Sequence, residues 1–177
     1  PEIEDMIKYL NKMGAKIKGA GTDRIEITGV KKLAEISYNI MPDRIEAGTY
    51  LVAGAITGGK VKLTNVYPEH IEPILNKLEE ANCKLTIGKN TIEIEAPKRV
   101  KAVDIKTMPY PGFPTDMQSI FATMLTTAKG TSVVVENIFE NRYKYTQELI
   151  RMEAKITIEG RTAVIKGTRK LYPANVK

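Results

Sequence analysis

The stretch IEPILNKLEEANCKLTIGKNTIEI, from Ile71 to Ile94, decides the fold because the chain carries it in three variant copies. The other copies are IEDMIKYLNKMGAKIKGAGTDRIEI (Ile3–Ile27) and RYKYTQELIRMEAKITIEGRTAVI (Arg142–Ile165). Each copy predicts an amphipathic helix followed by two short alternating strands joined by turn residues. Self-similarity of this kind indicates one repeated supersecondary unit.

The residue at which each predicted helix ends differs among the copies. Gly14 and Asn82 tolerate the left-handed backbone that commonly ends a helix, whereas Glu153 in the third copy should be strained there. The next position holds a small residue in every copy, namely Ala15, Cys83 or Ala154. We therefore interpret Cys83, the single cysteine, as a buried packing residue and not as a nucleophile.

A second repeated half precedes two of the copies, at Ile45–Pro68 and Asp116–Phe139. Each predicts an apolar helix, a glycine stop and a β-branched strand. The complete unit of about 70 residues is then helix, strand, helix, hairpin. We expect an α/β (α+β) fold in which 42–106 and 107–177 form two units that fold together, with 1–41 as the back half of another. The helices are apolar around most of their circumference, so they should be buried beneath solvent-facing sheets.

Composition sets the remaining expectations. The 177 residues are 42% hydrophobic with a net charge of +6, and they contain no long apolar run and no signal pattern, which indicates a soluble, cytoplasmic protein. Lysine and glutamate are interspersed along the predicted strands, so the charge favours an anionic ligand only weakly and does not indicate a nucleic-acid surface. No phosphate loop, metal-ligand spacing or nucleophile elbow occurs, so we expect neither a cofactor nor a metal. The single histidine, His70, is expected to be exposed and not catalytic.

The proline-rich run MPYPGFPTDMQ (Met108–Gln118) is the most unusual local sequence. It predicts a rigid approach to a helix that starts with a capping box between Thr115 and Gln118, with Asp116 in the first helical turn. There the helix dipole would stabilise the Asp116 carboxylate. On this pattern alone, the simpler interpretation is an aspartate that decorates a helix start.

Two further polar clusters are candidates for binding. Arg44 stands before an apolar helix and could hold a phosphate or a carboxylate, or pair with Asp43 or Glu46 on the surface. The run from Asn137 to Arg142 lies where a strand turns into a helix. Backbone amides there could bind an anion or a hydroxyl, although capping explains Asn141 equally well.

Four runs closely resemble the UDP-N-acetylglucosamine 1-carboxyvinyltransferase family: GTDRI (21–25), MPDRIEAGT (41–49), FPTDMQ (113–118) and IFENR (138–142). The resemblance implies transfer of enolpyruvate from phosphoenolpyruvate to the 3-hydroxyl of UDP-N-acetylglucosamine, with release of phosphate, as the first committed step of peptidoglycan synthesis. It also implies the inside-out α/β barrel of enolpyruvyl transferases, whose two domains each contain three repeated units. A 5-enolpyruvylshikimate-3-phosphate synthase-like transferase and a non-enzymatic repeat-built binding domain are the alternatives.

Residue by residue, the resemblance makes Asp116 the proposed base that contacts the sugar 3-hydroxyl and Ile138 the residue whose backbone contacts the nucleotide sugar. Arg142 and Arg44 match active-site arginines that face the interdomain cleft in that family. The family's loop with a reactive cysteine has no counterpart here, and Cys83 does not match it. We therefore expect a fragment that is inactive without the remainder of the enzyme, its 1–41 segment being the last half-unit of the loop-bearing domain.

Overall fold

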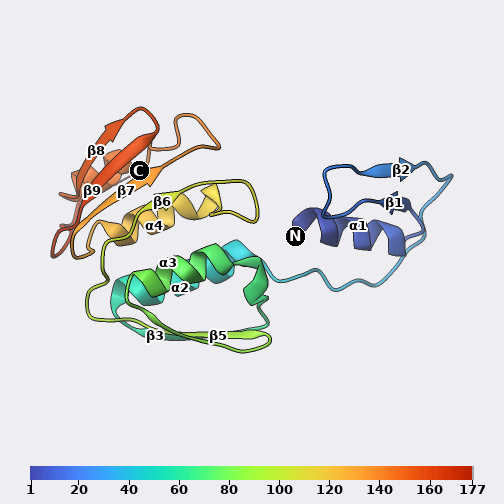
Figure 1. Ribbon diagram of the computed structural model, residues 1–177, viewed down its shortest axis with the longest axis horizontal. Helices are drawn as coiled ribbons and strands as arrows, with labels where there is room; N and C mark the ends of the chain where they lie inside the picture. The colour runs from blue at the N-terminus through green and yellow to red at the C-terminus, as the bar shows by residue number, and fades with distance from the viewer. Residues whose placement is uncertain (177) are drawn as a thin grey trace. The chain divides into compact units, whose positions relative to one another are not determined.

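The computed structural model describes residues 1–176, which divide into two compact units, 1–42 and Asp43 onward (Figure 1). In the first unit, helix α1 (Glu2–Lys12) is followed by strands β1 (Lys16–Lys18) and β2 (Glu26–Thr28), which pair antiparallel. The extended segment after β2 returns to α1, where the Tyr38 hydroxyl donates a hydrogen bond of 2.8 Å to the Asp5 carboxylate. This unit is the helix and hairpin that the first sequence copy predicts.

The apolar face of α1 is only partly covered, since Ile7 is 5% exposed but other members of the face are not buried. Ile3 and Met6 are 52% and 50% exposed, whereas their equivalents in the second copy, Ile71 and Ile74, are 1% and 0% exposed. The same sequence pattern is therefore fully buried in one copy and partly exposed in the other.

The second unit begins with the helix, strand, helix and hairpin of one full repeat. Its elements are α2 (Arg44–Thr57), β3 (Lys60–Thr64), the 3₁₀ turn η1 (Pro68–His70), α3 (Glu72–Glu80), β4 (Lys84–Ile87) and β5 (Thr91–Glu95). The three strands form an antiparallel sheet in the order β3-β5-β4.

The next repeat follows the same order with one added strand. Its elements are β6 (Ile105–Lys106), the 3₁₀ turn η2 (Thr115–Met117), α4 (Gln118–Leu125), β7 (Thr131–Val135), α5 (Thr146–Arg151), β8 (Lys155–Glu159) and β9 (Thr162–Lys166). The sheet order is β6-β7-β9-β8, with β6 parallel to β7 and the other pairs antiparallel. The predicted repeat is therefore present twice in this unit.

Helices α2, α3 and α4 lie between the two sheets of this unit, as Figure 1 shows. Leu51 of α2 and Phe121 of α4 are fully buried, and strands β3, β5, β7 and β9 alternate more exposed with less exposed residues. The prediction of buried helices and outward-facing sheets is confirmed for this unit. The arrangement is a mixed α/β domain, and residues 1–176 form no closed barrel.

Two glycines bring α2 close to its neighbours. A Cβ at Gly48 would lie 2.9 Å from the Cε atom of Met117, and one at Gly54 would lie 2.9 Å from Cγ2 of Val61. Since any larger side chain would push these groups away, the glycines set the distance from α2 to β3 and to η2. The turn η2 carries Asp116, so this packing also positions a candidate site residue.

All three copies leave their first helix through the same turn. Gly14, Asn82 and Glu153 have φ angles of 99°, 68° and 67°. In each copy, the backbone amide of the next residue donates a hydrogen bond of 3.0 Å to the carbonyl five residues before it. The pairs are Ala15 to Leu10, Cys83 to Leu78, and Ala154 to Leu149. This is the hydrogen bond expected of a left-handed helix end. The predicted strain at Glu153 therefore falls on a residue with a Cβ in the left-handed region.

We expect Glu153→Gly to raise the free energy of unfolding by about 0.5–1 kcal/mol, because it removes that strain at an exposed site. Chemical denaturation of the chain followed by circular dichroism measures the change. Glu79→Gly, at an exposed position inside α3, is the matched control and should lower stability by a similar amount. Destabilisation by both substitutions would contradict the explanation.

Two single residues test the sequence interpretation. Cys83 is 5% exposed, and burial raises the pKa of its thiol to about 11, so the thiol stays protonated at neutral pH. Its interpretation as a packing residue is confirmed. His70, expected to be exposed, is half-buried with its ring edge-on to Tyr67 at 5.2 Å. No helix within residues 1–176 is long and apolar enough to cross a bilayer.

Candidate functional site

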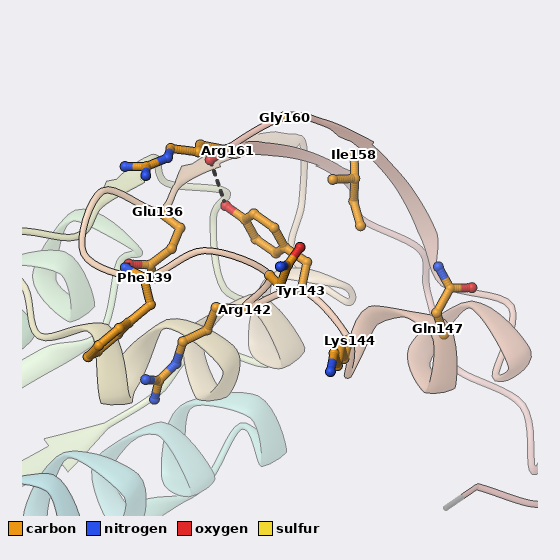
Figure 2. A pocket seen from close by; sticks show the side chains of 10 residues that line it. Glu136, Phe139, Arg142, Tyr143, Lys144, Gln147, Ile158, Gly160 and Arg161 are labelled. Atoms are coloured by element: carbon orange, nitrogen blue, oxygen red, sulfur yellow. Dashed lines mark hydrogen bonds between the residues drawn. The ribbon is translucent and has the colours of Figure 1, made fainter.

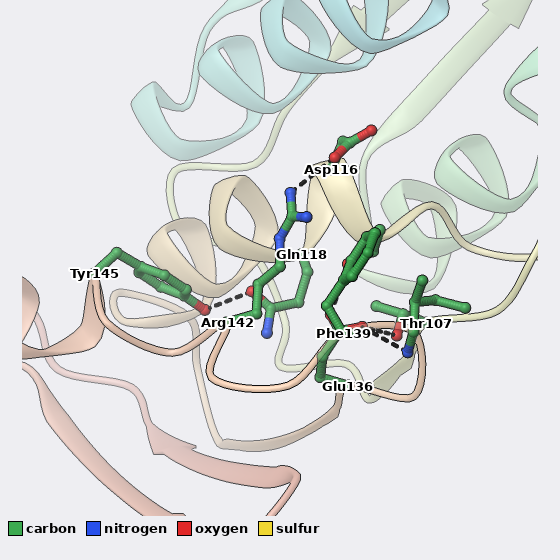
Figure 3. Close-up of polar contacts among 9 residues, drawn as sticks. Thr107, Asp116, Gln118, Glu136, Phe139, Arg142 and Tyr145 are labelled. Carbon is green, nitrogen blue, oxygen red and sulfur yellow. Dashed lines mark hydrogen bonds and ion pairs between the residues drawn. The ribbon is translucent and has the colours of Figure 1, made fainter.

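Glu136, directly after β7, is the centre of the polar cluster in the second unit (Figure 3). Alternation along β7 turns Ser132 and Val134 inward, and Glu136 continues the same face with 1% exposure. A carboxylate in this position must be hydrogen-bonded, because an unpaired buried charge is very costly.

Four donors from three segments supply those bonds. Oε1 accepts from the Thr107 hydroxyl at 2.8 Å and from the amides of Ile138 and Phe139 at 2.8 and 3.1 Å. Oε2 accepts from the Thr115 hydroxyl at 2.8 Å. The carboxylate thus joins the end of β6, the start of η2 and the loop that follows β7.

Burial would raise the pKa of Glu136, but the hydrogen bonds from Ile138, Thr115, Phe139 and Thr107 outweigh it and leave the pKa below its usual value. Glu136 is therefore ionised at neutral pH. Because its pKa is lowered in the folded state, the carboxylate stabilises the fold at pH values above its unfolded-state pKa. That stabilisation is lost as the pH falls through the folded-state pKa.

Asp116 and Arg142, two of the residues singled out from the sequence, form an ion pair in this cluster (Figure 3). An Nη atom of Arg142 lies 2.7 Å from Oδ1 of Asp116, and the guanidinium lies 5.3 Å from the centre of the Phe139 ring. The side chains of Asp116 and Arg142 are 57% and 33% exposed, so both reach solvent. A ligand could therefore contact either residue.

The capping box expected between Thr115 and Gln118 is wrong. Thr115 starts a 3₁₀ turn and donates its hydroxyl to Glu136, and Gln118 is fully buried and accepts from the Tyr145 hydroxyl at 2.9 Å. Both side chains are drawn to tertiary partners, which local sequence cannot show. Asp116 does lie in the first helical turn, as expected, although that turn is 3₁₀.

The idea that amides after β7 receive a ligand anion also needs correction. The amides of Ile138 and Phe139 already donate to Glu136, so the protein supplies their anion. The carbonyl oxygen of Ile138 accepts no hydrogen bond from residues 1–176. It is the backbone group that Ile138 can offer to a ligand, and it would take a donor such as a hydroxyl or an amide N–H.

Asn141 has a φ of 56° and stands before a series of turns, and α5 begins only at Thr146. Its capping of that helix, the alternative weighed from the sequence, is therefore wrong.

Arg44, at the start of α2, contacts the proline-rich run. Its guanidinium lies 5.6 Å from the centre of the Tyr110 ring, a cation–π distance. Asp43 was considered above as a surface partner of Arg44. Its carboxylate caps α2 by accepting hydrogen bonds from the amides of Ile45 and Glu46 at 2.7 and 3.1 Å. Arg44 therefore packs on the segment that leads to Asp116.

A pocket of about 290 Å³ opens beside the loop after β7 (Figure 2). Arg142, Lys144 and Arg161 supply its positive charge, and the Tyr143 hydroxyl on its wall donates to the carbonyl of Arg161 at 3.0 Å. Within residues 1–176, no three acidic, histidine or cysteine side chains gather as metal ligands. The pocket can accommodate an anion beside Arg142.

The sequence interpretation missed Glu136. A usable signal existed, because the alternation from Ser132 through Val134 places Glu136 on the buried face. A buried glutamate at a strand end requires several donors, and such a residue often organises a site.

The fold is similar to that of two solved enzymes. The enolpyruvyl transferase NikO from Streptomyces tendae superposes with a TM-score of 0.79 at 21% identity, covering 92% of this chain and 39% of that chain. EPSP synthase from Acinetobacter baumannii gives 0.63, also at 21% identity, over 93% and 40%. At this identity the likeness concerns the fold, which is of the enolpyruvyl transferase type.

The EPSP synthase (3-phosphoshikimate 1-carboxyvinyltransferase) family matches residues 1–177, and the chain belongs to this family. UDP-N-acetylglucosamine 1-carboxyvinyltransferase 1 of Caldanaerobacter subterraneus subsp. tengcongensis is 54% identical over the whole chain and 43% of its own length. The enzyme of that name from Geobacter metallireducens is 52% identical over 99% of the chain and 42% of its length. The chain thus spans under half the length of these relatives, and the resemblance inferred from its motifs is confirmed.

Proposed function

We propose that this chain contributes the acceptor-activating part of a UDP-N-acetylglucosamine 1-carboxyvinyltransferase. The observation that carries the proposal is the 54% identity to a relative of that name, which extends over the segments holding Asp116, Ile138 and Arg142. The ion pair between Asp116 and Arg142 brings these two side chains together.

In the proposed reaction, the 3-hydroxyl oxygen of UDP-N-acetylglucosamine attacks C2 of phosphoenolpyruvate. Asp116 accepts the hydroxyl proton as the new C–O bond forms, since a neutral hydroxyl is a weak nucleophile. A proton adds to C3 to complete a tetrahedral adduct. Loss of a C3 proton and cleavage of the C2–O bond to phosphate then restore the double bond and release phosphate. The product is the enolpyruvyl ether of the nucleotide sugar.

Arg142 orients the base and supplies positive charge beside it. One Nη holds an oxygen of Asp116, and the remaining guanidinium donors can bind a carboxylate or phosphate oxygen of phosphoenolpyruvate. Ile138 receives the sugar through its carbonyl oxygen. We propose that Arg44, whose guanidinium lies over the Tyr110 ring, also faces the bound substrates.

We further propose the two-domain, inside-out barrel architecture for the whole protein, with 1–41 in one domain and 42–177 in the other. The exposure of Ile3 and Met6 on α1 supports this, because their equivalents in the second copy are buried by packing. The proposed activity is the first committed step of peptidoglycan synthesis, and we place it in the cytoplasm.

The acceptor is tested in a full-length protein, which contains this chain and the segments that complete the length of its relatives. Phosphate release from phosphoenolpyruvate is measured with UDP-N-acetylglucosamine and, separately, with shikimate 3-phosphate, because the matching family is described by the second activity. We expect turnover with UDP-N-acetylglucosamine alone. Turnover with shikimate 3-phosphate alone would establish the alternative.

Residues 1–177 by themselves should show only background phosphate release with UDP-N-acetylglucosamine. The resemblance implies a reactive-cysteine loop and further arginines that contact phosphoenolpyruvate, and the chain has no counterpart of that loop. The full-length protein assayed in parallel is the positive control. Turnover by the isolated chain at a comparable rate would show that the described residues hold a complete active site.

A further inference from the structure

We propose that Glu136 is a positioning residue of the transferase site, whose buried carboxylate sets the spacing between the base Asp116 and the sugar-binding backbone of Ile138. The proposal rests on the proposed function. It concerns a residue that contacts neither substrate in that proposal and acts through its neighbours.

The hydrogen bonds of Glu136 reach both sides of the proposed sugar site. Oε2 holds the hydroxyl of Thr115, the residue before Asp116, at 2.8 Å. Oε1 holds the amide of Ile138 itself at 2.8 Å and that of Phe139 at 3.1 Å. One rigid group thus connects the segment of the base to the segment of the sugar contact.

Thr107 adds further hydrogen bonds to Glu136 and to the loop after β7. Its hydroxyl donates to Glu136, and its Oγ1 accepts the Asn137 amide at 2.8 Å. The Asn137 side-chain amide donates in turn to the Thr107 carbonyl at 3.3 Å. The loop from Asn137 to Phe139 is therefore held at three consecutive amides, which fixes the position of the Ile138 backbone.

A carboxylate accepts from all four donors as they stand. Its two oxygens accept four hydrogen bonds without presenting a donor, whereas glutamine would place an NH₂ group against one of the partners. The backbone amides at Oε1 cannot reverse their polarity, so the glutamine nitrogen would face Thr115, whose hydroxyl would have to accept a hydrogen bond instead of donating one. Glu136→Gln should therefore disturb the Asp116 side of the link more than the Ile138 side.

Spacing matters here because the base and the hydroxyl must meet within hydrogen-bond reach. A misplacement of about 1 Å can lower a rate by about 10²-fold without weakening binding. A positioning role therefore predicts a fall in kcat with little change in KM for UDP-N-acetylglucosamine.

The experiment measures phosphate release by the full-length protein and its variants with phosphoenolpyruvate saturating and UDP-N-acetylglucosamine varied, which gives kcat and KM. Thr115→Val removes only the hydroxyl that reaches Glu136 and should lower kcat about 10-fold with KM within about twofold. Thr126→Val is the matched control. Thr126, the residue after α4, is fully buried, and its hydroxyl donates a hydrogen bond of 2.7 Å to the Thr123 carbonyl. The control should leave kcat of the folded protein unchanged.

A double-mutant cycle shows whether Thr115 acts through the base. With Asp116→Asn already present, Thr115→Val should lower the residual rate less than about twofold, since no base is left to position. Equal effects in both backgrounds, or an unchanged kcat in Thr115→Val and Glu136→Gln, would overturn the positioning role. Absence of turnover in the unmodified protein would overturn the proposed function itself, so the two failures are distinguishable.

Discussion

Asp116→Asn in the full-length protein should lower kcat for phosphate release by about 10²–10⁴-fold and leave the affinity for UDP-N-acetylglucosamine within about tenfold. Asparagine keeps the size of aspartate and an oxygen that can face Arg142, but it cannot accept the hydroxyl proton. We expect the substitution to lower kcat and not the affinity, because the proton moves only as the new C–O bond forms. Asp116→Ala should be similarly slow.

The matched control for this prediction is Asp104→Asn. Asp104 is an exposed aspartate of the same unit, and its Oδ1 accepts the Val133 amide at 2.7 Å, a role that asparagine can also fill. Its turnover should stay close to that of the unmodified protein. Near-complete turnover by Asp116→Asn would make Asp116 a residue that only decorates a helix start.

Phe121→Ala should lower the free energy of unfolding of the second unit by about 3–5 kcal/mol. Phe121 is fully buried in α4, and its ring meets that of Phe113 edge-on with a centroid distance of 5.0 Å. The substitution leaves a cavity between the sheets and removes this aromatic contact. Chemical denaturation of residues 1–177, followed by circular dichroism, measures the loss.

Tyr50→Ala separates burial from the general loss of an aromatic ring. Tyr50 lies on α2 but is 55% exposed, so its removal should cost less than about 1 kcal/mol. Comparable losses for the two variants would show that α4 does not form the centre of the core.

Local sequence patterns identified some residues of the candidate site and missed others. Asp116 and Arg142 were identified from the motifs that contain them, and the structure joins them in an ion pair. Glu136 was missed because its importance comes from Thr107 and Thr115, which precede it by 29 and 21 residues. The capping box failed for the same reason, since Thr115 bonds across the fold instead of along its own helix.

The sequence alone determined the repeat, the order of helix and strand within it, and the left-handed helix ends at Gly14, Asn82 and Glu153. Those features follow from short-range patterns, namely apolar periodicity and the conformational preferences of single residues. It also determined that Cys83 occupies a small buried position.

Tertiary structure decided the rest. The same apolar helix pattern is buried in α3 and partly exposed in α1, because burial depends on which elements pack against a face and not on the face itself. The charge state and partners of Glu136 likewise arise only when β6, η2 and the loop after β7 come together. Hydrogen bonds to a buried carboxylate require donors from distant segments, and their convergence is a property of the fold.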